Sequence, residues 1–138
     1  MNKSYLIKFD WIFLISICLF TFTIAIYAAQ PWGDNYAYKD LADYFSLLGM
    51  MLWAISPYLA MFIVLFIFSR KKVLIKTFSI CMLIISLFAG YILFDTMFIH
   101  IDAQGGLIFL FLPIYQWLAF FIMLFICAAV NKFTKKDI

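Results

Sequence analysis

Long, almost unbroken runs of hydrophobic residues alternate with short polar segments along this chain. The runs cover about residues 9–29, 44–69, 76–99 and 106–130. A helix needs about 20 apolar residues to cross a bilayer core, whereas a strand of a membrane barrel alternates polar and apolar positions over about ten residues. The pattern therefore predicts an all-α, polytopic integral membrane protein whose four transmembrane helices form a single domain, residues 1–138.

The overall composition supports this prediction, since 68% of the residues are hydrophobic and only 12% are charged. Soluble domains contain about 45–50% apolar and about 25% charged residues. A chain of 138 residues has too little interior to hide so much apolar surface from water, so lipid must be its main solvent. The charges lie at the ends of the apolar runs rather than on one basic face, which argues against nucleic acid as a partner.

Lysine and arginine are divided unequally between the two ends of the predicted helices. One end carries nine of them: Lys3, Lys8, Arg70, Lys71, Lys72, Lys76, Lys132, Lys135 and Lys136. The other end carries only Lys39. Because cytoplasmic loops are enriched in these residues, we expect both termini in the cytoplasm. The compact architecture and a bias toward Ile, Phe and Lys indicate the cytoplasmic (inner) membrane of a bacterium.

The first predicted helix carries small residues at helical spacing and one acidic residue. Cys18, Thr21, Ala25 and Ala29 are spaced three, four and four residues apart, which predicts a face that packs against another helix. Asp10 lies at the cytoplasmic end of the run. The chain resembles small multidrug exporters in its length and number of spans. Their proton-coupling carboxylate lies inside the first span, whereas the only carboxylate of the first run here is Asp10 at its cytoplasmic end.

A group of polar side chains lies near the predicted midplane of the second and fourth helices. Gln116 is about eleven residues past the polar turn that precedes the fourth helix, roughly 16 Å deep at 1.5 Å per residue. Tyr115, Tyr58 and Ser56 are at similar depth. Two interpretations are open: these side chains line a small polar cavity, or they form a hydrogen bond that holds the two helices together.

Two prolines within the same helices add hydrogen-bond acceptors at this depth. Proline has no N–H and kinks a helix, so Pro57 frees the carbonyl of Trp53 and Pro113 frees that of Phe109. We therefore expect kinks at both prolines and two exposed carbonyl groups near the polar side chains.

The outer end of the third and fourth helices holds a second polar group, Asp95, His100 and Asp102. A histidine with two carboxylates is a conceivable metal or acid–base site. On an ideal α-helix, however, Asp95 and His100 point about 140° apart, and Asp102 is expected to be the N-cap of the fourth helix. We expect neither a metal site nor a cofactor, and the chain lacks a glycine-rich phosphate loop, HExxH and GxSxG.

These features favour a small bacterial inner-membrane protein without catalysis of its own. Its expected partners are the lipid bilayer and another membrane protein or a second copy of itself, for which it serves as an accessory, assembly or immunity-type protein. Immunity proteins against pore-forming bacteriocins include small four-span proteins with cytoplasmic termini, and the chain resembles them in topology. One alternative is a small oligomeric transporter or channel that uses the polar midplane layer. A third possibility is a membrane enzyme that acts on lipid at the outer face.

Overall fold

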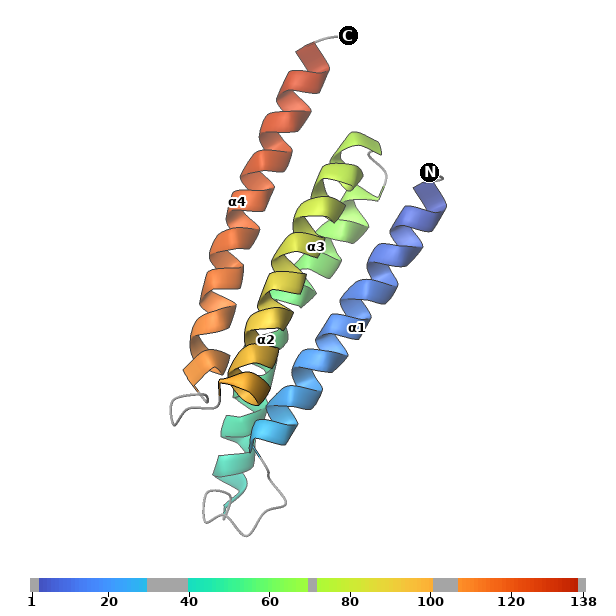
Figure 1. Ribbon diagram of the computed structural model, residues 1–138. Coiled ribbons are helices and arrows are strands. Elements are labelled where there is room, and N and C mark those ends of the chain that lie inside the picture. The colour runs from blue at the N-terminus through green and yellow to red at the C-terminus, as the bar shows by residue number, and fades with distance from the viewer. Residues whose placement is uncertain (1–2, 30–39, 70–71, 101–106, 137–138) are drawn as a thin grey trace.

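The computed structural model describes residues 3–29, 40–69, 72–100 and 107–136 (Figure 1). These residues form the helices α1 (Lys3–Ala29), α2 (Leu41–Phe68), α3 (Lys72–Phe94) and α4 (Ile108–Lys136). A short π-helix, η1 (Asp95–Ile99), continues α3. Four stretches are long and apolar enough to cross a membrane: Ile7–Ala29, Leu41–Phe68, Leu74–Ile99 and Ile108–Phe133. The prediction of an all-helical chain with four helices of spanning length is confirmed.

The four helices pack as an antiparallel bundle in which α2 and α3 are central. α1 packs against both of these helices, and α4 packs against both from the other side (Figure 1). α2 and α3 also contact each other, so α1 and α4 lie at opposite corners of a diamond-shaped arrangement. The start of α1 and the end of α4 lie at the same end of the bundle (Figure 1).

Two apolar clusters fill the interior, one in each half of the bundle. The half nearer the chain termini is built around Tyr58, Phe78 and Met82, and the other half around Leu93 and Phe109. Because lipid does not drive apolar helix faces together as water does, such clusters depend on close packing.

Small residues allow α1 to approach α3 closely. Within the predicted packing face of α1, Thr21 and Ala25 are buried, and Cys18 and Ala29 are half-buried. A Cβ atom added at Gly90 of α3 would lie 3.0 Å from Cδ1 of Ile17. A larger residue at position 90 would therefore require the end of the Ile17 side chain to move.

The outer surface of the bundle suits an apolar solvent. Large hydrophobic side chains are exposed on all four helices. The exposed hydroxyls of Ser16, Thr23 and Ser46 each donate to the backbone carbonyl four residues earlier, at 2.9, 2.8 and 3.0 Å. These three hydroxyls thus bond within their own helix, as polar groups in an apolar solvent must.

Each helix extends beyond its predicted span at one end, and α1 and α3 begin at Lys3 and Lys72 rather than near 9 and 76. α2 begins at Leu41 rather than near 44, because the Asp43 carboxylate accepts the Asp40 backbone N–H at 3.1 Å and thereby caps the first turn. α4 continues to Lys136 rather than ending near 130. Lysine and asparagine are tolerated in a helix, so the polar residues that end the apolar run do not end the helix.

Candidate functional site

The polar side chains at mid-depth join α2 to α4. Gln116 Nε2 on α4 donates a hydrogen bond to Tyr58 Oη on α2 at 2.7 Å. Both side chains are buried, with 3% of Gln116 and 0% of Tyr58 exposed. The structure therefore brings together two of the predicted midplane residues, with one amide N–H and the tyrosine hydroxyl bonded to each other.

Two tryptophans extend this contact between α2 and α4. Trp117 Nε1 donates to Ser56 Oγ at 3.0 Å, and Trp53 Nε1 donates to the Leu110 carbonyl at 3.2 Å. An indole N–H in apolar surroundings needs an acceptor, and each tryptophan, one exposed and one half-buried, has its acceptor on the opposite helix. We call this set the α2–α4 seam; its side chains are Trp53, Ser56, Tyr58, Gln116 and Trp117.

Each of the prolines Pro57 and Pro113 lies close in sequence to residues that form the seam bonds. Ser56 Oγ donates at 2.8 Å to the carbonyl of Trp53, which is the carbonyl that Pro57 deprives of its helical donor. A serine hydroxyl thus restores the hydrogen bond that the proline removes, as is common in membrane helices. On α4, Leu110 lies in the turn that precedes Pro113, and its carbonyl is the acceptor for Trp53.

Tyr115 does not belong to the seam, although it was predicted to lie with Gln116. Its side chain is 66% exposed and lines an apolar groove of about 390 Å³ between α3 and α4. Gln116 reaches the inner edge of the same groove. The two neighbours therefore face different surroundings, because consecutive residues of a helix point about 100° apart.

Asp95 and His100 lie together at the opposite end of the bundle from the termini. His100 Nδ1 is 3.1 Å from both carboxylate oxygens of Asp95. The expectation that these side chains point apart is wrong, because the backbone here is a π-helix, closed by a 2.8 Å bond from the His100 N–H to the Asp95 carbonyl. A π-turn brings residues five apart onto one face. Asp102, the third predicted member, lies outside the described residues.

A buried carboxyl group links α1 to α3. Ser79 Oγ donates to Asp10 Oδ1 at 2.6 Å, and the Asp10 side chain is fully buried. The second oxygen, Oδ2, has no hydrogen-bond partner among the described residues. Sequence reasoning treated Asp10 only as a charge at the cytoplasmic end. It lies four residues before Leu14 and eight before Cys18, in register with the packing face of α1, and that spacing was the available signal.

Thr21 is the other buried polar side chain of α1. Its Oγ1 atom faces the Tyr58 hydroxyl but makes no hydrogen bond of regular geometry among the described residues. Sequence reasoning placed Thr21 on the packing face without a polar role. The seam residues Trp53 and Trp117 were also missed, although tryptophans far from the helix ends are a signal that their N–H groups need acceptors.

The side chains of the seam are neutral, so they interact through hydrogen bonds rather than through charges. Within the described ranges, no group of three or more His, Cys, Asp and Glu side chains could hold a metal ion. No protein family, characterised protein or solved structure shows significant similarity to this chain.

Proposed function

We propose that this chain is a multi-pass protein of a bacterial cytoplasmic membrane, with both termini in the cytoplasm. It acts as an accessory, assembly or immunity-type partner of another membrane protein, without catalysis of its own. Four helices of spanning length support its place in a membrane, and the excess of Lys and Arg at the end that carries the termini supports its orientation.

The observation that carries the proposal is that the midplane polar groups form hydrogen bonds between α2 and α4. The amide of Gln116 and the indole N–H groups of Trp53 and Trp117 all donate across the α2–α4 interface. A binding site for a transported solute needs polar groups that are available to that solute. Here one N–H of each of these three side chains is used to hold two helices together, which favours a bundle that serves as a scaffold and acts through its surface.

The outer end of α3 is the described surface best suited to recognise a partner. His100 is 76% exposed, and its Nδ1 atom is engaged by Asp95. The other ring nitrogen, Nε2, can therefore bind a group on a partner while Asp95 fixes the orientation of the ring. The π-helix holds both side chains at the end of a spanning helix, where a neighbouring membrane protein would meet them.

Co-purification from the native membrane tests this proposal. The tagged chain, cross-linked in intact cells and extracted in a mild detergent, should carry one larger membrane protein in fixed stoichiometry. His100→Ala should lower its recovery about tenfold, the effect of losing about 1.4 kcal/mol of binding energy. Lys132→Ala, an exposed residue at the opposite end of the bundle, is the matched control and should leave recovery unchanged. Recovery of the homo-oligomer alone contradicts the proposal, and equal loss in both variants contradicts the assigned surface.

A further inference from the structure

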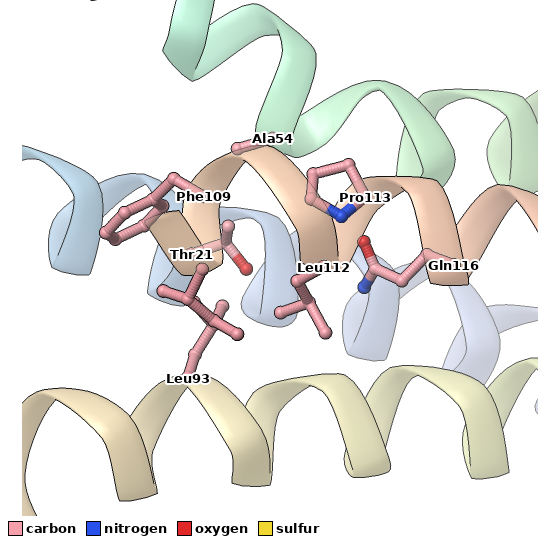
Figure 2. A pocket seen from close by; sticks show the side chains of 8 residues that line it. Thr21, Ala54, Leu93, Phe109, Leu112, Pro113 and Gln116 are labelled. Carbon is pink, nitrogen blue, oxygen red and sulfur yellow. The ribbon is translucent and has the colours of Figure 1, made fainter. Parts of the chain in front are cut away.

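A small cavity lies where all four helices meet. It has a volume of about 10 Å³ and is lined by Thr21 of α1, Ala54 of α2, Leu93 of α3 and one face of α4 that includes Gln116 (Figure 2). At this level α1 and α4, which otherwise occupy opposite corners of the bundle, face the same space. The cavity therefore sits beside the α2–α4 seam, on the side that faces α1.

Two buried polar side chains are directed into this space. In the view of Figure 2 the Thr21 hydroxyl and the end of the Gln116 amide lie on either side of the Leu112 side chain, and all three line the cavity. Thr21 Oγ1 faces the Tyr58 hydroxyl, but it makes no hydrogen bond of regular geometry among the described residues. Thr23, two residues further on and on the exposed side of α1, instead donates to the Leu19 carbonyl at 2.8 Å. Thr21 therefore differs from Thr23, whose hydroxyl is bonded within α1.

The opposite wall offers further hydrogen-bonding capacity. Gln116 uses one N–H on Tyr58, and an amide has a second N–H and a carbonyl oxygen. Pro113 also lines the cavity, and because it has no N–H, the carbonyl of Phe109 lacks its usual helical donor. A ligand in the cavity would therefore meet a hydroxyl, an amide and a backbone carbonyl.

We propose that this cavity binds one water molecule, which bridges the Thr21 hydroxyl to the Gln116 amide. A volume of about 10 Å³ is close to the space that one water needs, and buried waters bond two to four polar groups. The eight lining residues are all uncharged, which favours water over a metal cation. The water supplies the regular hydrogen bond that Thr21 lacks and connects α1 to the α2–α4 seam.

Magnetisation transfer from water, measured by NMR on the full chain in lipid nanodiscs, tests the site. We expect water cross-peaks to the Thr21 hydroxyl or methyl group and to the Gln116 side-chain amide. Thr21→Val keeps the shape of the side chain and removes the hydroxyl, so it should abolish the cross-peak at Gln116. Thr21→Ser keeps the hydroxyl and should preserve it.

Thr23→Val is the matched control, since Thr23 is exposed and bonded within its own helix. It should leave the Gln116 cross-peak unchanged. If the wild-type spectrum is well dispersed but shows no magnetisation transfer from water to Thr21 and Gln116, the cavity is empty. That result would overturn the proposal. A Gln116 cross-peak that survives Thr21→Val would also overturn it, because that water would not be held by Thr21.

Discussion

The buried Asp10 carboxyl group has one oxygen without a partner among the described residues, and the donor to its other oxygen is a serine. Ser79→Ala removes the 2.6 Å bond to Asp10 Oδ1 and leaves a fully buried carboxyl group without that donor. Leaving such a group unsatisfied costs about 1–3 kcal/mol, and more if it is charged. We therefore expect a loss of this size in the free energy of unfolding, measured by denaturant titration in detergent micelles.

Ser86→Ala is the control for this loss. Ser86 is also fully buried on α3, but its contact is a weak 3.8 Å hydrogen bond to the Met61 sulfur. Its replacement should cost clearly less than that of Ser79. Equal losses in the two variants would show that the bond to Asp10 contributes no more than a generic buried hydroxyl.

At the scale of single residues, sequence reasoning was limited by the geometry it assumed. Asp10 entered only the count of charged residues on each side of the membrane. That count contains no information on which face of the helix a charged residue occupies. Asp95 and His100 were separated by assuming 3.6 residues per turn, which a π-helix does not obey. Gln116 was correctly identified as a polar group at depth, since the apolar run around it makes it conspicuous.

At the scale of elements, the pairing of α2 with α4 depends on hydrogen bonds that a double-mutant cycle can measure. Gln116→Leu and Tyr58→Phe each remove one side of the 2.7 Å bond. Interhelical hydrogen bonds in membranes contribute about 0.6 kcal/mol on average and at most about 1.7 kcal/mol. We expect a coupling energy in this range from the unfolding free energies of the single and double variants in micelles.

The neighbouring tyrosine supplies the control cycle. Tyr115 is exposed in the α3–α4 groove rather than bonded to Gln116, so Tyr115→Phe combined with Gln116→Leu should show a clearly smaller coupling energy, the part due to adjacency on α4 alone. A coupling as large as that of Tyr58 would mean that the cycle reports general repacking of α4 rather than the hydrogen bond.

The number and type of the helices were predictable because a long apolar run in lipid satisfies its own backbone hydrogen bonds by forming a helix. The ends of the helices were less predictable. The start of α2 depends on a contact between Asp43 and Asp40, and the end of α4 lies in polar residues that hydropathy assigns to a tail. The π-helix was not predicted, since nothing in the sequence from Asp95 to Ile99 distinguishes it from an α-helix.

At the scale of the whole molecule, the distribution of charge and the arrangement of the helices lead to the same topology. The start of α1 and the end of α4 lie at one end of the bundle (Figure 1), and nine of the ten Lys and Arg residues belong to that end in the sequence pattern. Since cytoplasmic segments are rich in these residues, this end should face the cytoplasm. The end that carries Asp40, Asp95 and His100 should then face outward.

Single cysteines placed at the two ends test this topology. Asp40→Cys should react with a membrane-impermeant maleimide in intact cells, whereas Lys132→Cys should react only after the membrane is permeabilised, because both residues are exposed but at opposite ends. The wild-type chain is the background control: Cys18, Cys81 and Cys127 lie within spanning stretches and are buried or half-buried, so they should label weakly in both conditions. The reverse pattern would place the basic end outside and would contradict the proposed orientation. It would also move the Asp95–His100 surface to the cytoplasm, where its partner would have to be sought.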